Sequence, residues 1–411
     1  MPKIKILVIL PDTSGVGKFR LLSPFTYIQE NYGDDFHIDI VTNVSDNDEA
    51  FNNYDIIVAH SFIHSNVPFE RNIERVEWLK KQGKIVIVDF DDYWELDQRH
   101  PMFAYSRQSK MSENKVKWMK CANYITVTTP VFRNTIYNKF KLNNVYVFPN
   151  AIDDTEKQFI PNPEPSDKIR FGFLGGSSHL YDLELLSNGI QTTYNEYKDK
   201  CQFVLCGFDL RGKIRELDRE TGQVKERDIL PEESVWTKYE KIFTDNYRAI
   251  DDNYNNILKL YKEDVNINDN NLPYRRIWTK PVNTYATNYN KFDVSLAPLV
   301  DSVFNHNKSQ LKVVEAGFHK KALIASEINP YTIDLISAVE KGGGYNSKGN
   351  ALLVSSSKNH KQWGQHMVRL IKNPNLIEDL GNKLYETVKV NYSLKKVSKD
   401  RVDFIKSIYN K

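Results

Sequence analysis

Cysteine is scarce in this sequence, and metal-binding patterns are absent from it. The 411 residues contain three cysteines, Cys121, Cys201 and Cys206, at spacings that fit neither a zinc site nor a disulfide framework. A secreted domain held together by disulfides is therefore disfavoured, and we expect reduced, partly buried thiols. Such cysteine usage is typical of a protein of the cytosol.

Long apolar runs and a large net charge are also missing. The first apolar run, Ile4 to Leu10, is followed by Pro11 and Asp12, whereas a membrane-spanning helix needs about 20 apolar residues. We interpret the run as a buried strand and expect a cytoplasmic protein, with peripheral contact at the inner membrane face left open. The 56 basic and 53 acidic residues give a net charge of +3. This balance disfavours nucleic acid as a partner without excluding a local basic patch.

A third absence is that of a dinucleotide-binding fingerprint. The glycine-containing loop after the first strand reads G-x-G-x-x-R, with Gly15, Gly17 and then Arg20 where a third glycine is required. An NAD-dependent enzyme is disfavoured for this reason. Gly15 and Gly17 would instead let the backbone approach a donor or an acceptor. Lys18 and Arg20 could meet a phosphate or form ion pairs at a helix start.

Buried strands that alternate with helices are the strongest pattern that is present. Continuous apolar runs between helical segments are typical of a parallel sheet that is covered on both faces. Residues 155–167 carry three prolines and few apolar side chains, which indicates a linker. Before the linker, strands are expected at 4–10, 37–43, 54–60, 84–90, 123–129 and 144–150.

After the linker the alternation restarts, so we expect an α/β protein with two Rossmann-like domains. We predict an N-terminal domain over residues 1–155, a C-terminal domain over 168–390, and a final helix within 391–411 that packs at the domain junction. In the second domain, strands are expected at 168–176, 201–208 and 275–281, with two more inside 293–327.

An insertion at about 209–274 interrupts the second series of strands. Its first part, RGKIRELDRETGQVKERD, is a charged run that predicts an exposed hairpin or loop. For the segment after this run, core packing is the favoured interpretation, over an acceptor platform or a dimer surface. Apolar and aromatic residues recur in that segment every three or four positions, as on one face of amphipathic helices: Trp236, Tyr239, Phe243, Tyr247, Ile250, Tyr254, Ile257 and Tyr261.

The stretch from Asp293 to Glu327 predicts a strand, a polar loop, a helix and a second strand. A helix start that follows a strand offers backbone amides and a partial positive charge to an anion. Lys308 in the loop is the first candidate for holding that anion, and Lys312, one turn further on, is the second. Glu315 could bind hydroxyls of the molecule that carries the anion.

Five segments together resemble glycosyltransferase family 4. In chain order they are TSGVGKFR, VDFDDYW, VFPNAID, FGFLGG and FNHNKSQLKVVEAGFHKKALIAS, and the last is similar to the pattern FNxxKSxLKxxExGxxxxPVIAS of one branch. The resemblance extends from the first strand to the last helix, apart from the insertion. It implies the GT-B fold, in which two Rossmann-like domains face an inter-domain cleft and a C-terminal helix crosses back. It also implies a retaining glycosyltransferase with a nucleoside-diphosphate sugar as its donor.

The resemblance assigns roles within the Asp293–Glu327 stretch. Asn307, Lys308 and Ser309 would stabilise the leaving diphosphate with backbone amides and a cation. Glu315 matches the second glutamate of the family's Glu-x7-Glu motif, which binds the ribose. The first glutamate falls at position 307, where this chain has asparagine. Because asparagine can hydrogen-bond a hydroxyl but carries no charge, the identity of the sugar and full activity are left open.

Loops at the carboxyl ends of other strands should complete the site. By resemblance, Val282 lies near the base. Among the histidines of polar loops, His306 and His179 are the favoured substrate contacts because of their neighbours. The loop after the strand at 168–176 could form an amide nest for the diphosphate or serve only as a tight turn; its residues are Gly175, Gly176, Ser177 and Ser178.

Asp91 and Asp92 follow the strand at 84–90. Asp92 could orient an acceptor hydroxyl or the donor sugar, or it could cap the next turn. The aspartate pair lies in the domain opposite the phosphate loop, so a metal held by it would not reach the diphosphate. We therefore predict metal independence and no cofactor beyond the nucleotide-sugar substrate.

The expected reaction is the transfer of a sugar to a hydroxyl acceptor. A growing surface polysaccharide, a lipid-linked glycan and a glycoprotein are candidate acceptors, and a modified DNA base is a less favoured one. Two alternatives belong to other classes. One is a catalytically silent GT-B protein that binds a glycan or a partner. It is considered because Asn307 stands where the family has a glutamate. The other is a nucleotide-sugar epimerase, which would need acid–base side chains in the cleft.

Overall fold

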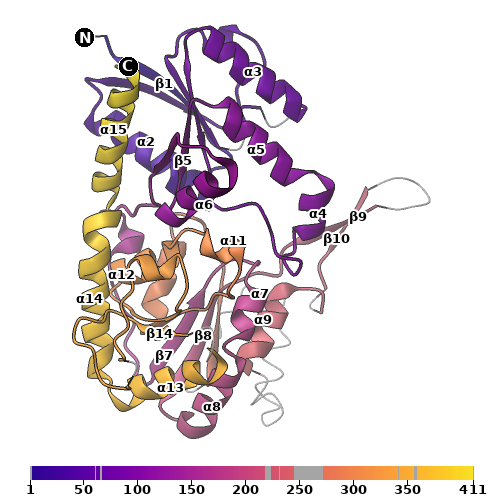
Figure 1. Cartoon of the computed structure of the whole chain (residues 1–411). Helices are drawn as coiled ribbons and strands as arrows, with labels where there is room; N and C mark the ends of the chain where they lie inside the picture. Colours follow the sequence, from indigo (N-terminus) through magenta and orange to yellow (C-terminus); the bar gives the residue numbers. More distant parts are fainter. Residues whose placement is uncertain are drawn as a thin grey trace.

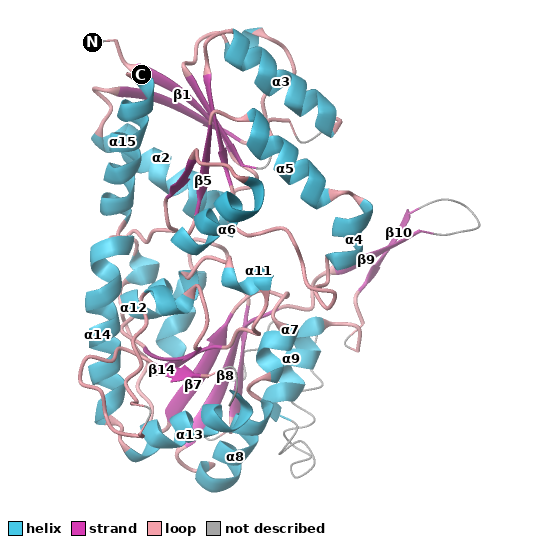
Figure 2. Ribbon diagram, viewed as in Figure 1, coloured by secondary structure: helices cyan, strands magenta, loops and turns pink. Residues whose placement is uncertain are grey.

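The computed structural model describes residues 2–60, 62–64, 67–217, 224–230, 232–244, 272–340, 342–355 and 359–410. Within these ranges the chain forms two six-stranded sheets, one above the other, with helices packed around each (Figures 1 and 2). A two-stranded hairpin projects from the side of the second unit (Figure 1). The expected α/β class is confirmed.

The first sheet is parallel and has the strand order β2-β1-β3-β4-β5-β6. Successive side chains point to opposite faces, and both faces are buried. Ile6 and Val8 of β1 belong to one hydrophobic cluster, and Leu7 and Ile9 belong to the other. The strands are β1 (Ile4–Ile9), β2 (Phe36–Val41), β3 (Ile56–His60), β4 (Ile85–Asp89), β5 (Tyr124–Val127) and β6 (Val145–Val147).

The helices that cover the two faces of this sheet come from different parts of the chain. Those on one face follow the strands in order, and the other face is covered by α2 together with the last helix of the chain. The elements are α1 (Gly15–Gly17), η1 (Lys18–Leu22), α2 (Ser23–Asn31), η2 (Glu49–Phe51), α3 (Phe69–Lys81), α4 (Phe103–Gln108), α5 (Met111–Cys121) and α6 (Pro130–Phe140).

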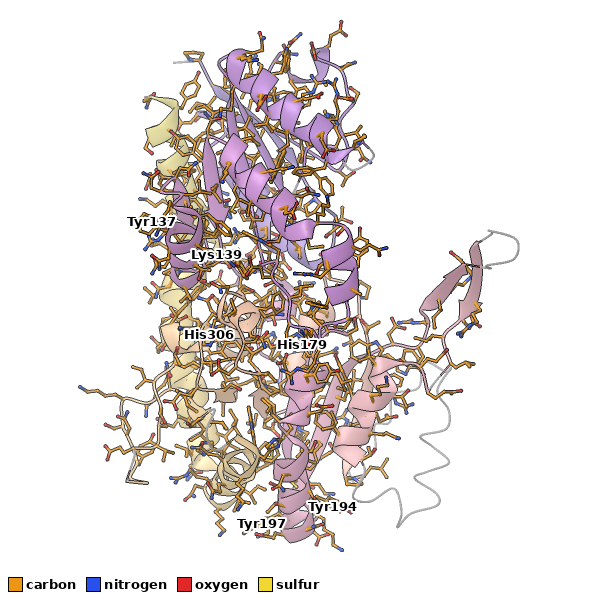
Figure 3. All side chains as sticks on the ribbon, turned by 45° about the vertical axis from the view of Figure 1, so that its right-hand side comes forward. Tyr137, Lys139, His179, Tyr194, Tyr197 and His306 are labelled. Carbon is orange, nitrogen blue, oxygen red and sulfur yellow. The ribbon has the colours of Figure 1, made fainter. Side chains whose placement is uncertain are left out.

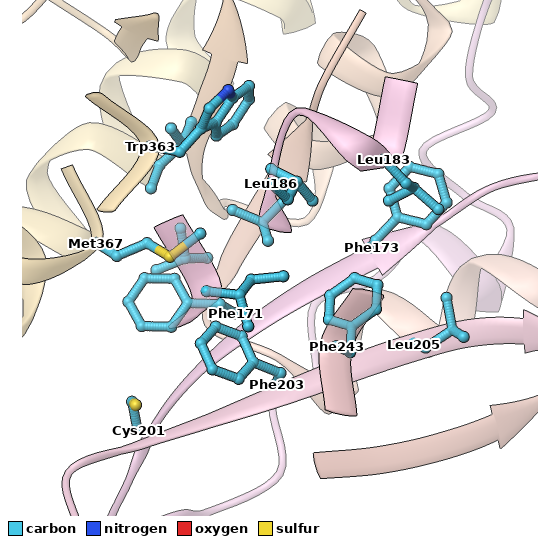
Figure 4. Close-up of a cluster of buried hydrophobic side chains, with 14 of the residues drawn as sticks. Phe171, Phe173, Leu183, Leu186, Cys201, Phe203, Leu205, Phe243, Trp363 and Met367 are labelled. Atoms are coloured by element: carbon cyan, nitrogen blue, oxygen red, sulfur yellow. The ribbon is translucent and has the colours of Figure 1, made fainter. Parts of the chain in front are cut away.

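The second sheet is also parallel, with the strand order β11-β8-β7-β12-β13-β14. On one face Phe171 of β7 and Phe203 of β8 share a buried cluster with Trp363 and Met367 of α13 (Figure 4). The strands are β7 (Ile169–Leu174), β8 (Cys201–Phe208), β11 (Tyr274–Trp278), β12 (Val294–Ala297), β13 (Ala322–Ser326) and β14 (Leu352–Val354).

The helices of the second half both cover its sheet and return the chain to the first sheet. They are η3 (Lys157–Phe159), α7 (Leu180–Glu184), α8 (Ser187–Tyr197), α9 (Val235–Thr244), η4 (Tyr285–Lys291), α11 (Val303–His306), α12 (Leu311–Phe318), η5 (Tyr331–Ile333), α13 (Asn359–Lys372), α14 (Asn375–Tyr392) and α15 (Leu394–Tyr409).

Helix α15 crosses back to the N-terminal half, as the fold class predicts. Ser393 forms a parallel bridge with Ile152 and is the N-cap of α15. The helix then packs on α2, so that both chain termini lie at the same end of the molecule (Figure 1). Phe404 and Ile405 are among its buried side chains.

The insertion contains the hairpin β9 (Lys213–Leu217) and β10 (Val224–Asp228), which pair antiparallel where the sequence predicts an exposed hairpin or loop. In α9, Tyr239 and Phe243 are buried in the core of the second half. Core packing is therefore the correct interpretation for this part of the amphipathic face. The remainder of the predicted face, from Tyr247 to Tyr261, lies outside the described residues.

The first glycine loop is shorter than the sequence predicts. A helix is expected from Arg20 onward, but helical turns begin at Gly15 and pass through a π-helical segment into α2. Gly17 lies inside these turns, where a Cβ atom would come 1.8 Å from the carbonyl oxygen of Asp12. Close backbone approach therefore requires glycine at this position.

Among the described helices, none is long and apolar enough to cross a membrane.

Candidate active site

A cavity of about 510 Å³ lies where the two halves of the molecule meet. From the first half it is lined by Ser14, Gly15 and Phe19, after β1, and by Asp91 and Asp92, after β4. The other lining residues belong to the second half. Both parallel sheets therefore direct the carboxyl ends of their strands at one cavity, which is where open α/β sheets bind ligands.

In the second half, the carboxyl end of β8 and the loops after its neighbouring strands line the cavity. Because these strands lie side by side in the order β11-β8-β7-β12, the outer two are about three strand spacings, or roughly 14 Å, apart. The site is therefore elongated along the sheet edge. In strand order the lining residues are Thr279, Lys280 and Val282; Gly207; Gly175, Gly176, Ser178 and His179; and Leu299 and Lys308.

Two lysines lie at the β12 end of this row. The Nζ atom of Lys312 donates to the carbonyl oxygen of Leu174 at 2.6 Å, and burial lowers the pKa of its ammonium group to about 8. The Nζ atom of Lys308 lies 4.0 Å from a carboxylate oxygen of Asp92, across the cleft. Each ammonium group keeps N–H donors beyond these contacts. The pair beside the Gly175 loop can therefore hold an anionic group.

Glu315 lies deeper in the cavity wall and is 4% exposed. Its carboxylate accepts hydrogen bonds from the hydroxyl of Tyr285 and, at 2.9 Å, from that of Tyr289. Burial raises the pKa of this carboxyl, and the hydroxyl of Tyr285 and the ammonium of Lys312 oppose that rise. The two tyrosines orient the carboxylate, whose oxygens retain acceptor sites for ligand hydroxyls.

His179 and Asp182 form a buried pair at the start of α7. The Nδ1 atom of His179 lies 2.8 Å from Oδ2 of Asp182. The other oxygen of Asp182 accepts from the backbone N–H of Val300 at 2.8 Å and from the amide of Asn305 at 3.2 Å. Asp182 thus joins the loop after β7 to the loop that carries Lys308.

The pKa of His179 is lowered to about 4, mainly by burial. The charges of Lys312 and Lys308 also lower this pKa, and their effect exceeds the opposite effect of the pairing with Asp182. The imidazole is therefore neutral at pH 7. The backbone N–H of His179 donates to the hydroxyl of Tyr239 at 2.6 Å, and that hydroxyl donates to the carbonyl oxygen of Gly176. Figure 3 shows His179 and His306 near the level at which the two halves meet.

Asp91 and Asp92 differ in environment although they are adjacent. Asp91 accepts a hydrogen bond from Asn150 at 3.0 Å, and burial, together with the charge of Asp92, raises the pKa of its carboxyl to about 7. Asp92 is exposed and faces Lys308. Asp91 can therefore gain or lose a proton near neutral pH, which sequence reasoning did not assign to it.

Comparison with known proteins identifies the architecture. No family model matches the sequence, and no curated protein matches it. Sucrose-phosphate synthase from Thermosynechococcus elongatus matches with a TM-score of 0.65 and 12% identity over 100% of both chains. HepE from Anabaena, in complex with UDP and glucose, matches with a TM-score of 0.59 and 8% identity over 99% of this chain and 100% of that chain. The chain has the GT-B fold.

A third GT-B structure is a protein from Listeria monocytogenes assigned as a UDP-N-acetylglucosamine 2-epimerase. It matches with a TM-score of 0.51 and 10% identity, over 100% of this chain and 97% of that chain. At identities this low the likenesses concern the fold alone. They confirm the expected GT-B architecture and do not test membership of glycosyltransferase family 4.

Most of the sequence-predicted site residues line the GT-B cavity, but Asn307, His306, Ser177 and Gly17 are not among its described lining residues. Asn307 is 2% exposed, and its amide nitrogen donates to the carbonyl oxygen of Val303 at 2.7 Å. Those that line the cavity are Asp92, Gly15, Gly175, Gly176, Ser178, His179, Val282, Lys308, Ser309, Lys312 and Glu315.

The side chains of Asn307 and His306 both make contacts within their own loop. In the described chain, the Oδ1 atom of Asn307 has no hydrogen-bond partner. His306 directs its Nε2 atom at the carboxylate of Asp301, 2.7 Å away. The family resemblance made Asn307 a candidate, and its neighbours in sequence made His306 one. Residues adjacent in a helical turn point in different directions, however.

Both Lys18 and Arg20 form ion pairs. The sequence left open whether these two residues bind a phosphate or pair with carboxylates. Arg20 is fully buried and donates to both carboxylate oxygens of Asp89, which lowers the pKa of that carboxyl strongly. Lys18 lies 2.7 Å from Glu156 in the linker. The guanidinium of Arg20 therefore ties together elements of the first half. Lys18 links that half to Glu156 and to Asn283 of the second half. Over the described residues, no cluster of three or more His, Cys, Asp or Glu could hold a metal ion.

Sequence reasoning missed the residues that support or extend the GT-B site. The spacing of His179 and Asp182, three residues apart at a helix start, was a usable signal for their pairing. In the segment after β11 the family resemblance pointed to Val282 alone, because the insertion obscures the sequence pattern there. The missed lining residues are Ser14, Phe19, Leu174, Gly207, Thr279, Lys280, Tyr285, Asn288, Leu299, Leu311 and Tyr331.

Proposed function

We propose that this chain is a glycosyltransferase that uses a nucleoside-diphosphate sugar. The observation that carries the proposal is the position of Lys308 and Lys312 beside the Gly175–Ser178 loop, in a cavity that also contains Glu315. The lysines and loop amides suit a diphosphate, and the Glu315 carboxylate suits the hydroxyls of a ribose. HepE, which has the same fold, is in complex with UDP and glucose.

Catalysis depends on where charge develops. As the glycosidic bond breaks, negative charge builds on the leaving phosphate, and a cation that is already in place stabilises it. Lys308 is our candidate for this role, since it faces Asp92 across the cleft and has further N–H donors. Because two ammonium groups supply the positive charge, we propose that the reaction needs neither a metal ion nor another cofactor.

We propose that the reaction proceeds with retention, by displacement on one face of the sugar. The leaving phosphate takes the proton of the acceptor hydroxyl, and Asp92 orients that hydroxyl from the N-terminal half. Closure of the cleft would exclude water. Retention, family 4 membership and a surface polysaccharide, lipid-linked glycan or glycoprotein as acceptor are supported by the motif resemblance.

A thermal-shift panel tests this proposal. UDP, GDP, ADP, TDP and CMP are added with and without Mg²⁺, and a nucleotide at about 100 times its dissociation constant should add about 2.7 kcal/mol to the free energy of unfolding. Lys308→Ala and Glu315→Ala should each weaken the shift, whereas Lys399→Ala, at an exposed residue of α15, should not. If no nucleotide stabilises the protein, the proposed site is wrong.

A nucleotide-sugar epimerase is the second candidate, because the structure places acid–base groups in the cleft. Asp91, with its pKa raised to about 7, lines the cavity together with His179. The Listeria structure assigned as an epimerase shares the fold. Incubation of the protein with a nucleotide sugar and no acceptor tests this candidate: an epimerised sugar, seen by NMR, supports the epimerase, and an unchanged donor excludes it.

A further inference from the structure

We propose that residues 99–120, which contain helix α4 and most of α5, dock on the surface of an anionic lipid bilayer and bring a lipid-linked acceptor to the cleft. This segment is called the basic arm below. Docking on the bilayer is independent of the proposed function, whereas the choice of a lipid-linked acceptor rests on it.

The basic arm concentrates the positive charge of the chain. It contains six basic residues and one acidic residue, Glu113, and so has a surplus of five positive charges. The whole chain has a net charge of only +3, so the remainder of the sequence is slightly acidic. A local excess of one sign on a nearly balanced protein attracts a surface of the opposite charge.

Most of these cations are exposed, and their charges are not neutralised by an ion pair within the described chain. The contrast is with α15, where Lys396 and Lys399 pair with Asp400 and Asp403 one turn further on. In α5 the exposed cations lie on the side away from the core. The four exposed cations without an ion pair to a described residue are Arg107, Lys110, Lys117 and Lys120.

Helix α3, which packs beside α5, does not cancel the charge of the arm. Val76 and Leu79 of α3 share a buried cluster with Trp118 and Met119 of α5. The exposed charged residues of α3 are three acids and three bases, so their sum is zero: Glu70, Glu74, Glu77, Arg71, Lys80 and Lys81. The surplus of positive charge therefore stays with the basic arm.

Met102 and Tyr105 favour a bilayer over other polyanions. They are 46% and 57% exposed, and they lie three residues apart at the start of α4, on the same side of its first turn. An exposed methionine adds nothing to binding through phosphate charges alone. The headgroup region of a bilayer, in contrast, takes up apolar and aromatic side chains beside the cations.

The basic arm begins at the cleft. Arg99 and Lys308 both line a small cavity of about 40 Å³ beside the main one. The guanidinium of Arg99 lies 5.1 Å from the ring centre of Tyr181, and the ring of His100 packs edge-on against that of Phe304 at 5.2 Å. These contacts fix the base of the arm to the second half, and Figure 1 shows α4 at the end of the first half that faces the second. An acceptor anchored in a bilayer beneath the arm would therefore reach the cleft.

Cosedimentation of the full chain with vesicles tests the inference. The probes are vesicles of phosphatidylcholine alone and vesicles of equal parts phosphatidylcholine and phosphatidylglycerol. The protein should bind the mixed vesicles in preference to the neutral ones, and less tightly as the ionic strength rises. A variant that combines Arg107→Gln, Lys110→Gln, Lys117→Gln and Lys120→Gln should bind at least about a hundredfold more weakly, because each Lys or Arg at an anionic surface adds about fivefold, or about 1 kcal/mol.

The matched control removes the same charge from exposed lysines of the second half. Lys198→Gln, Lys200→Gln, Lys348→Gln and Lys361→Gln together should leave vesicle binding within about twofold of the parent, because exposed charges far from the membrane are screened. A second variant, Met102→Ser with Tyr105→Ser, should also weaken binding to the mixed vesicles. All these side chains are exposed, so every variant should melt at the temperature of the parent.

The inference is wrong if the protein binds no vesicles, or if it binds neutral and mixed vesicles equally. It is also wrong if the control variant loses as much binding as the variant of the basic arm. Binding of a double-stranded DNA fragment without binding of the mixed vesicles would show that the arm recognises nucleic acid instead. In each of these cases a thermal shift by a nucleotide would still support the proposed function, so the two failures are distinguishable.

Discussion

At the residue scale, His179 shows how the site affects stability. Its imidazole is held neutral because it is buried between Asp182 and the ammonium groups of Lys312 and Lys308, with Tyr239 against its backbone. A histidine in the unfolded chain has a pKa of about 6.5. The unfolded state therefore binds more protons than the folded state between pH 4 and pH 6.5.

We predict that the free energy of unfolding falls as the pH decreases through this window, by up to about 3 kcal/mol for His179 at about 1.4 kcal/mol per pKa unit. Chemical denaturation at pH 7, 6, 5 and 4 measures this loss. His179→Gln should make the profile less steep, while His37→Gln, at an exposed residue, should reproduce the parent. An unchanged slope in His179→Gln would show that the buried imidazole is not responsible, and His366 would be the next group to test.

Arg20 illustrates a residue that sequence alone could not interpret. Its position after a glycine loop is compatible with phosphate binding, and only the fold shows that Asp89, 69 residues away, occupies its guanidinium. Lys308 and Glu315 are the opposite case. Their spacing in a strand–loop–helix stretch identified them, and the structure places both in the cavity wall.

At the element scale, close packing of helices α8 and α13 depends on glycine. A Cβ atom on Gly189 would lie 2.7 Å from the Cβ of Trp363 and 2.8 Å from the backbone nitrogen of Gly364. These contacts are shorter than carbon and nitrogen atoms tolerate, so the helices would have to separate. Trp363 is fully buried in the adjoining core (Figure 4).

We predict that Gly189→Ala destabilises the protein by about 1–3 kcal/mol, the range for overpacking a core. The higher helix propensity of alanine, up to about 1 kcal/mol, offsets only part of this loss. Urea denaturation measures the difference. Gly212→Ala is the control, because no atom lies within 4 Å of a Cβ placed there; equal stabilities for the two variants would contradict the packing argument.

Element boundaries were predicted less well than elements. The strands expected at 4–10 and 201–208 appear as β1 and β8 almost unchanged, because continuous apolar runs leave little choice of structure. The helix expected from Arg20 instead starts at Gly15. Its first turns are stabilised by Asp12, whose carboxylate accepts from the backbone of Ser14 and Gly17, a local contact that periodicity does not reveal.

At the scale of the whole molecule, α15 joins the end of the chain to the first sheet. The ring of Phe404 packs against the rings of Tyr124, Tyr146 and Phe148, with centroids 4.4 to 5.7 Å apart. Arg401 donates to the backbone oxygen of Arg20 at 3.1 Å. The C-terminal helix is thus part of the core of the N-terminal half.

We predict that Phe404→Ala destabilises the protein by about 3–5 kcal/mol, since it removes a buried ring from this cluster. Tyr409→Ala, in the last turn of the same helix and 37% exposed, should cost much less. Thermal and urea unfolding of both variants measure the difference. If Phe404→Ala is as stable as Tyr409→Ala, α15 is not an integral part of the first core.

The sequence by itself determined the α/β alternation, the two parallel sheets and the stretch that carries Lys308 and Glu315. These features depend on local periodicity and on which strand a loop follows. Only the tertiary structure decided that Arg20 is paired with Asp89, that the amide of Asn307 donates to Val303, and that Asp182 bonds to a loop residue 118 positions away. Such contacts arise between residues distant in the chain, where neither spacing nor composition records which groups will meet.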